Sequence, residues 1–274
     1  MIGIFEFYEA DSFLHRRNPA VKLLALLMVM LVVTPASDPV VPALFLPLIL
    51  VALHVLGRVP LRLILRMLLP LTLLVFPFLL FNALYYNIGQ VAAPTPWVRL
   101  GPWTLYREGV IVGLAVSLRV LVFISLSMSY ITTTDPTDFA LSLIQQAHIP
   151  YRFGYAILVS YRFLPLMVQE FSTIRAAHRV RGVGEHVGLR GRLEQVRRYT
   201  VPLLASAIRK SERTAIAMDA RGFGSAGERT YYRQLRVTPG DWGLVAGTVL
   251  VSVGMVAVLY VLRLLHNYGP IPPA

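Results

Sequence analysis

The chain has 274 residues, of which 56% are hydrophobic and only 15% are charged, whereas a soluble domain of this length carries about 25% charged residues. The apolar residues come in long runs, which excludes a single soluble core and indicates a polytopic α-helical membrane protein. The formal net charge of +12 does not indicate nucleic-acid binding, because most basic residues lie between 132 and 239 or at the ends of apolar runs, as the positive-inside rule expects. The absence of cysteine excludes disulfides and thiolate metal sites.

Five apolar runs are expected to span the membrane as helices, covering about residues 20–35, 40–56, 67–86, 108–131 and 242–265. Basic residues precede the first run, follow the second and follow the fourth. With five spans, all three basic clusters lie on one side, which is the cytoplasmic side. We therefore expect a membrane protein with a cytoplasmic N-terminus. A six-span alternative would insert 153–168, but that run is short and is interrupted by Arg162 and Pro165.

The expected fold class is all-α and polytopic, with about five transmembrane helices and long cytoplasmic amphipathic helices. Three regions are expected along the chain. They are an N-terminal four-helix transmembrane region over 1–131, a cytoplasmic helical region over 132–239, and a transmembrane helix with its tail over 240–274.

The cytoplasmic region predicts a short helix that starts at Asp135-Pro136 and two longer amphipathic helices, at about 152–181 and 193–221. Apolar positions recur on each long helix at steps of three, four or seven. They are Leu164, Met167, Phe171 and Ile174 on the first helix and Leu204, Ile208, Ala215 and Met218 on the second. A glycine-rich linker joins the two helices, and Gly182 and Gly222 supply their stops.

Both long helices end in the same way, with Arg181-Gly182 and Arg221-Gly222. Taken singly, an arginine in the last turn offsets the helix dipole by about 0.3–1 kcal/mol, and the glycine after it is an ordinary cap. The repetition on consecutive amphipathic helices favours docking to an acidic partner, where loss of a buried arginine–carboxylate pair costs about 2–5 kcal/mol. The candidate docking residues are Val180, Arg181, Gly182, Ala220, Arg221 and Gly222.

Other candidate sites are weaker. The stretch RGVGEHVG lacks the preceding strand and the GK[ST] signature of a phosphate loop, so a flexible linker is the better interpretation. The six histidines lack the spacing of a helical metal site, and no catalytic constellation stands out. Arg119 lies within the fourth apolar run. An intramembrane charge is a functional candidate, and the alternative is an internal bond to carbonyl groups or to Asn82.

Four stretches together resemble the transmembrane T component of energy-coupling factor (ECF) transporters, which import vitamins and metals. The similarity runs over about Tyr8–Arg236. The stretches are DSFLHRRNPAVKLL from Asp11, REGVIVGLAVSLRVLVFISLSMSYITTTDPTD from Arg107, VSYRFLPLMVQEFSTIRAAHRVRG from Val159 and AIRKSERTAIAMDARGFG from Ala207. The last two resemble the coupling helices of that family. One departure is Val180, where the family usually has alanine.

The resemblance implies a non-catalytic subunit that acts between two cytosolic ABC ATPase subunits and a separate substrate-binding membrane subunit. Arg181 and Arg221 would each enter an acidic groove of one ATPase subunit, and the apolar stripes would hold the substrate-binding subunit. ATP and Mg²⁺ would be bound by the partners, and this chain would need no cofactor of its own. The cargo would be a vitamin or a transition-metal ion.

Two further hypotheses come from other classes. A self-sufficient permease would use Arg119, Asn82 and the serines of the fourth run as its substrate route. A membrane enzyme would need clustered catalytic side chains, which the sequence does not show.

Overall fold

The computed structural model describes residues 8, 10–36, 38–85, 96–100, 103–182, 189–224 and 231–262. The chain forms two compact units. The first comprises Met1–Ser142 and Leu235–Ala274, and the second comprises Leu143–Gln234. The glycine-rich linker and the C-terminal tail fall mainly on residues outside the described ranges. The division into functional regions at 131 and 239 remains a prediction, since the two units are defined by packing alone.

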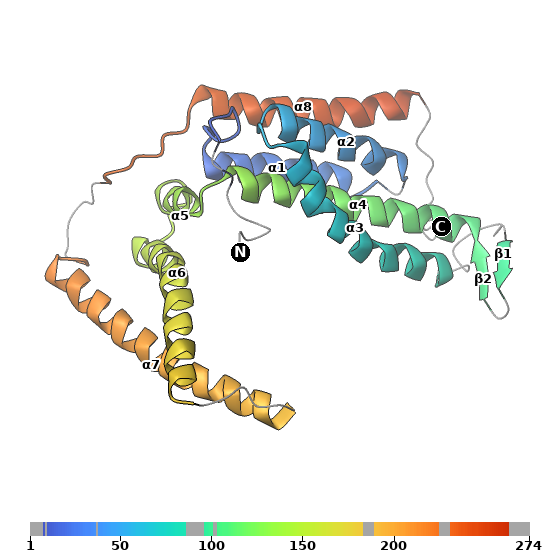
Figure 1. Ribbon diagram of the computed structural model, residues 1–274. Helices are drawn as coiled ribbons and strands as arrows, with labels where there is room; N and C mark the ends of the chain where they lie inside the picture. The colour runs from blue at the N-terminus through green and yellow to red at the C-terminus, as the bar shows by residue number, and fades with distance from the viewer. Residues whose placement is uncertain are drawn as a thin grey trace, which may run out of the picture. The chain divides into compact units, whose positions relative to one another are not determined.

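Within the described residues, the first unit contains five apolar helices, which confirms the expected helical membrane fold (Figure 1). They are α1 (Pro19–Val33), α2 (Val40–Val55), α3 (Leu61–Leu84), α4 (Arg107–Thr133) and α8 (Pro239–Val261). Among the described residues, α3, α4 and α8 are long and apolar enough to cross a membrane, whereas α1 and α2 have 15 and 16 residues. The 153–168 run does not form a separate span, because it is part of a longer helix described below.

The start of α1 illustrates how local sequence sets these helices. The Asn18 side chain accepts a hydrogen bond from the Ala20 amide at 3.1 Å, and Pro19 occupies the first helical position. Such a cap stabilises a helix by about 1 kcal/mol, and proline at this position loses no helical hydrogen bond. The motif RRNP is therefore a helix start.

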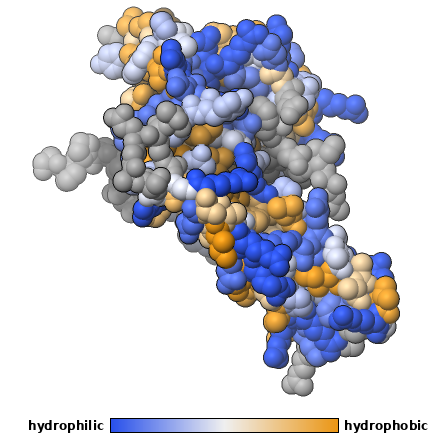
Figure 2. All heavy atoms as spheres, turned by 90° about the vertical axis from the view of Figure 1, so that its left-hand side faces the viewer, coloured by the Kyte–Doolittle hydropathy of each residue, from blue (hydrophilic) through white to orange (hydrophobic). Residues whose placement is uncertain are grey.

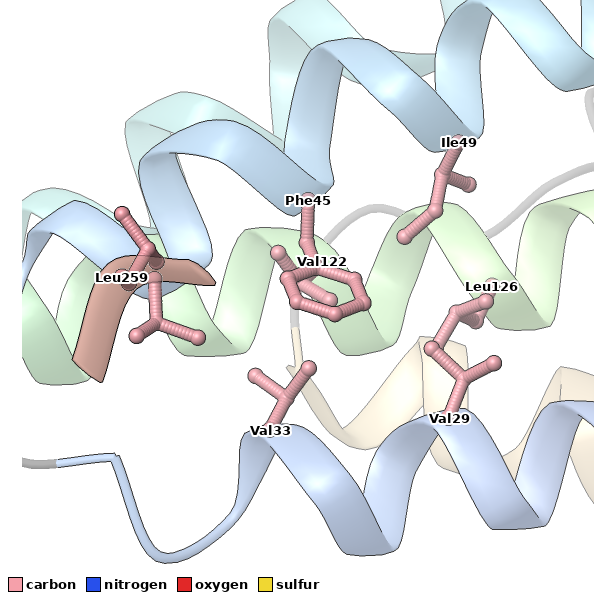
Figure 3. Close-up of a cluster of buried hydrophobic side chains, with 8 residues drawn as sticks. Val29, Val33, Phe45, Ile49, Val122, Leu126 and Leu259 are labelled. Atoms are coloured by element: carbon pink, nitrogen blue, oxygen red, sulfur yellow. The ribbon is translucent and has the colours of Figure 1, made fainter. Parts of the chain in front are cut away.

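The core of the first unit lies between α1, α2, α4 and α8. Figure 3 shows Val29 and Val33 of α1, Phe45 and Ile49 of α2, Val122 and Leu126 of α4, and Leu259 of α8 pointing toward one another. All seven are buried. Since α3 packs along α4 as well, α4 is the central helix of this unit.

A small hairpin precedes α4 and was not expected from the sequence. Strand β1 (Pro96–Leu100) pairs antiparallel with β2 (Trp103–Tyr106), with Leu100 opposite Trp103 and Arg99 opposite Thr104. The sequence alone predicts a polar, proline-rich loop through Trp97 and Trp103, and that prediction is wrong over these nine residues. Trp, Val, Thr and Tyr are residue types that favour strands, and they occur within PWVRL and WTLY, so this local signal was present in the sequence.

Three described helices lie between α4 and α8 in the chain. Helix α5 (Pro136–Gln145) begins as predicted, because the Asp135 carboxylate accepts a hydrogen bond from the Thr137 amide at 2.7 Å. The second unit is built mainly from α6 (Tyr151–Val180) and α7 (Leu189–Ala220), which cross each other (Figure 1). Pro165 and Pro202 lie inside these helices without ending them.

Candidate functional site

The two Arg-Gly pairs occupy equivalent positions at the ends of α6 and α7. Arg181 is the C-cap residue that follows Val180 of α6 and precedes Gly182, whose φ is +70° and whose amide donates to the Arg179 carbonyl at 3.1 Å. At the end of α7, Gly222 has a φ of +75° and its amide donates to the Asp219 carbonyl at 2.9 Å. Both glycines adopt a left-handed conformation that disfavours other residues, so they fix where each arginine leaves its helix.

The residues around both ends are exposed. Val180 is 88% exposed, and Arg181, Gly182, Ala220, Arg221 and Gly222 are all in the exposed class. Neither guanidinium has a carboxylate partner among the described residues. Two arginines without a carboxylate partner in the described part of the chain therefore stand at two helix ends, where their guanidinium groups can donate to a carboxylate.

A polar cluster fixes the crossing of α6 and α7. Glu170 of α6 forms a 2.6 Å ion pair with Lys210 of α7 and accepts a 2.8 Å hydrogen bond from the Ser206 hydroxyl. The hydrogen bond from Lys210, followed by that from Ser206, holds the pKa of Glu170 below its ordinary value. The Tyr199 ring contacts both Phe171 and His178 of α6, with centroid distances of 5.7 and 5.5 Å.

The aromatic contacts also define the direction of the pair. Phe223, just beyond the end of α7, packs against Tyr151 and Tyr155 at the start of α6, with centroid distances of 5.7 and 5.4 Å. Since Tyr199, early in α7, contacts His178, late in α6, the two helices run antiparallel. Arg181 and Arg221 therefore lie at opposite ends of the pair, and the structure does not bring them together.

The C-terminal ends of α6 and α7 differ in how tightly other residues pack around them. The Phe223 amide donates to the Met218 carbonyl at 2.9 Å, which completes a Schellman motif around Gly222. The Phe223 ring then packs on the first turn of α6. By contrast, Gly182 has no atom within 4 Å of the position that a Cβ would take.

The predicted apolar stripes divide into exposed and half-buried residues. On α6, Leu164 is 60% and Phe171 is 40% exposed, whereas Met167 and Ile174 are half-buried on the side that meets α7. On α7, Leu204 and Ile208 are 58% and 49% exposed, Ala215 is exposed, and Met218 is half-buried. Figure 2 shows one face of the molecule, on which hydrophobic patches lie among hydrophilic ones.

The longest exposed apolar row on α6 was only partly recognised from the sequence. It comprises Phe153, Ile157, Tyr161, Leu164 and Val168, which we call the α6 apolar row; all of its members are at least 45% exposed. Steps of four, four, three and four residues place these side chains on one face. The periodicity is visible in the sequence, but Arg162 and Pro165 lie between members of the row and obscure it.

Arg119 and Asn82 do not meet. An Arg119 Nη atom donates to the carbonyl of Ala36 in the turn between α1 and α2, and the Asn82 amide donates to Phe78 within its own helix at 2.9 Å. Arg119 lies about midway along α4, so the short helices α1 and α2 turn back beside the middle of α4. The guanidinium supplies a hydrogen bond to backbone that would otherwise lack a partner there.

Two buried side chains missed as candidates join the ends of α1, α4 and α8. The Lys22 ammonium is 3% exposed and donates to the Thr133 carbonyl, the Thr133 hydroxyl and the Thr134 hydroxyl at 2.9, 3.2 and 3.0 Å. Asp241 is 2% exposed; it accepts hydrogen bonds from the Asn18 amide at 3.1 Å and the Thr238 amide at 2.7 Å. The motifs around HRRNPAVK and TTTD are thus parts of one packed junction.

Sequence comparisons agree with this architecture. The family model described as "Cobalt transport protein" (CbiQ) matches residues 10–232. The chain belongs to this family of energy-coupling factor T components. The T component of Bacillus subtilis is 26% identical over 268 residues, covering 95% of this chain and 97% of that protein. The T component of Heliobacterium modesticaldum is 31% identical over 261 residues, covering 92% and 94%.

A third relative, the T component of Streptococcus thermophilus, is 29% identical over 240 residues, covering 85% of this chain and 89% of that protein. These relatives carry the name "Energy-coupling factor transporter transmembrane protein". The chain is accordingly a membrane-embedded, non-catalytic subunit of an ECF transporter. Within the described residues, no group of three His, Asp or Glu side chains could hold a metal ion.

Proposed function

We propose that the chain couples ATP hydrolysis by two cytosolic ABC ATPase subunits to movement of a substrate-binding membrane subunit. In this proposal the cargo is a vitamin or a transition-metal ion, and ATP and Mg²⁺ are bound by the ATPase subunits. The chain lies in the prokaryotic cell membrane with its N-terminus in the cytoplasm, since the basic clusters then all lie inside.

The observation that supports this function most directly is the placement of Arg181 and Arg221 at opposite ends of one antiparallel helix pair. Each arginine lies eleven residues beyond a member of the Glu170–Lys210 ion pair. At 1.5 Å per residue, each arm is about 16 Å long, so the two tips are separated by roughly 30 Å. A separation of that size suits two different protein partners better than one groove.

The apolar face of α6 and α7 is the observation that supports binding of the substrate-binding subunit. The α6 apolar row has no cover within the described part of the second unit, and it is continuous over four turns. Apolar side chains on a cytoplasmic or interfacial helix favour packing against another apolar helix. We assign this row to the substrate-binding subunit, together with the exposed Leu204 and Ile208 of α7.

The decisive experiment reverses both tip charges. The Arg181→Glu/Arg221→Glu variant is expected to lose co-purification with the ATPase subunits, while the chain remains inserted in the membrane and folded. Arg213→Glu is the matched control, because Arg213 is an exposed arginine in the body of α7. An intact complex with the double variant would refute the assignment of the tips.

A further inference from the structure

The first unit encloses an apolar cavity of about 390 Å³ between α1, α2, α4 and α8. Its floor consists of buried side chains, among them Ala25, Val29, Phe45 and Leu126. Its rim includes Phe13, Leu48 and Val251, which are 43%, 39% and 51% exposed. A buried floor with an exposed rim describes a slot that opens on the surface of the unit.

The slot forms where α8 is held at both ends and carries two glycines on its lining face between them. Asp241 joins the start of α8 to the Asn18 amide, and Leu259 enters the core near its end. Between these two points, Gly243 and Gly247 line the slot, and neither has an atom within 4 Å of the position of a Cβ. Because glycine has no side chain, these two positions leave space for a ligand beside α8.

Most of the lining comes from the half of each helix that lies toward one end of the unit. Lys22 and Ala25 belong to the first half of α1, Ile49 and Ala52 to the second half of α2, and Leu126 to the second half of α4. The first half of α8 completes the wall. This is the end to which positive-inside topology assigns the cytoplasm, so the slot lies at the level of the inner leaflet.

Cations surround the same end. The Arg17 guanidinium stacks on the ring of Phe13 at 4.2 Å, and Phe13 lines the slot. Arg58 lies two residues after Leu56, which lines the slot. An Arg58 Nη atom donates to the Asp11 carbonyl at 3.2 Å. Arg16, Arg17, Arg58 and Lys22 outnumber the nearby carboxylates of Asp11 and Asp241. The surroundings of the slot are therefore positive.

We infer that this slot binds one acyl chain of an anionic phospholipid of the inner leaflet, with the lipid headgroup near Arg58 and Arg17. The apolar floor matches a hydrocarbon chain, and it offers few polar partners to a polar ligand. The surplus of cations selects a negative headgroup, since basic residues near a membrane surface attract anionic lipid. The inference does not depend on docking of ATPase subunits.

The test compares two leucine substitutions in α8. Gly247→Leu fills the slot, whereas Gly254→Leu adds the same side chain at a glycine that is equally open and does not line the slot. Each full-length variant is purified in detergent after incubation in vesicles of equal parts phosphatidylglycerol and phosphatidylcholine with identical acyl chains. Bound lipid is counted by native mass spectrometry, and folding is checked by thermal unfolding.

We expect the unsubstituted chain and Gly254→Leu to retain one phosphatidylglycerol per chain, and Gly247→Leu to retain at least ten-fold less. Gly243→Leu provides a second slot-filling variant in case Gly247→Leu does not fold. Arg58→Asn is expected to reduce the preference for phosphatidylglycerol over phosphatidylcholine, because asparagine tolerates the positive φ of this residue and removes its charge.

Equal retention by Gly247→Leu and Gly254→Leu would overturn the lipid site. Equal retention of the two lipids by the unsubstituted chain would overturn the selection of an anionic headgroup. Loss of a protein partner from Gly247→Leu, with lipid retention unchanged, would show that a helix of another subunit occupies the slot, and that result also overturns the inference.

Discussion

Glu170 and Lys210 form a 2.6 Å ion pair at the crossing of α6 and α7, and each lies eleven residues before the arginine that ends its helix. The segments from the ion pair to the two arginines are thus equal in length. Ser206 adds a second hydrogen bond to Glu170, so the carboxylate is held from two positions on α7. A contact with this placement sets the angle at which both arginines are presented.

Charge reversal at this pair tests its positioning role. Glu170→Lys and Lys210→Glu are each expected to weaken co-purification of the ATPase subunits, because like charges then meet at the crossing and change the angle between the arms. The Glu170→Lys/Lys210→Glu double variant restores opposite charges and is expected to recover most of the binding. If the double variant retains no more ATPase subunit than either single variant, the two residues do not act as a pair.

The left-handed glycines can be tested at Gly182, which has no neighbour to clash with a new side chain. Gly182→Ala is expected to destabilise the last turn of α6 by about 1–2 kcal/mol, because alanine is strained at a φ of +70°. Gly182→Asn should cost less, since asparagine tolerates this conformation. Hydrogen exchange of the last-turn amides measures both effects, and equal exchange in the two variants would contradict the explanation.

The α6 apolar row predicts a separation of functions. Val168, the most exposed member of the row at 70%, is expected to contact the substrate-binding subunit. Val168→Asp should therefore release that subunit while the ATPase subunits remain bound, which is the reverse of the result expected for the arginine tips. Arg175→Asp, further along the same helix, serves as the control. Co-purification of the separate subunits decides the outcome.

Asp241 is expected to stabilise the first unit through its buried hydrogen bonds. In Asp241→Asn, one acceptor oxygen becomes a donor, so the amide of Asn18 or Thr238 loses its partner. Leaving such a buried group without a hydrogen bond costs about 1–3 kcal/mol. Thermal unfolding in detergent should show a lower midpoint, whereas Asp11→Asn, at an exposed carboxylate, should change it little.

His15 predicts a pH dependence of stability. Burial lowers the pKa of His15 below its ordinary value of 6.5, and the ring bonds to Ser12 and to the Tyr8 carbonyl, both at 2.7 Å. Below pH 6.5 the unfolded chain therefore binds more protons than the folded chain, so this contribution to stability is present above pH 6.5 and is lost as the pH falls through the folded pKa. His15→Gln, which keeps a donor and an acceptor, should remove this dependence from unfolding curves.

Local patterns predicted most of the architecture. Hydropathy located the five apolar helices to within a few residues, although α3 begins at Leu61 because Pro60 starts it, ahead of the expected position near Met67. The Arg-Gly ends were also predicted, since a glycine stop is a local signal. The contacts of Lys22 with Thr133 and of Asn18 with Asp241 could not be predicted, because partners 111 and 223 residues apart leave no periodic trace.

The same limit applies to the crossing. Glu170 and Lys210 look like ordinary solvated charges in their own helices, and only the antiparallel register of α6 and α7 brings them together. For the same reason, the sequence alone predicts that the apolar residues of each long helix form one uniformly exposed face. Met167 and Ile174 are half-buried in the structure, while the exposed surface belongs to the α6 apolar row.

The bond between the Asn18 amide and Asp241 has a consequence for synthesis of the protein. The two residues are 223 positions apart, and the whole second unit is encoded between them. At translation rates of about 5–20 residues per second, roughly 10 to 45 s separate the emergence of Asn18 from that of Asp241. The contact between the start of α1 and α8 therefore cannot form until α8 has left the ribosome. Truncation before α8 is complete would remove this last step in the assembly of the first unit.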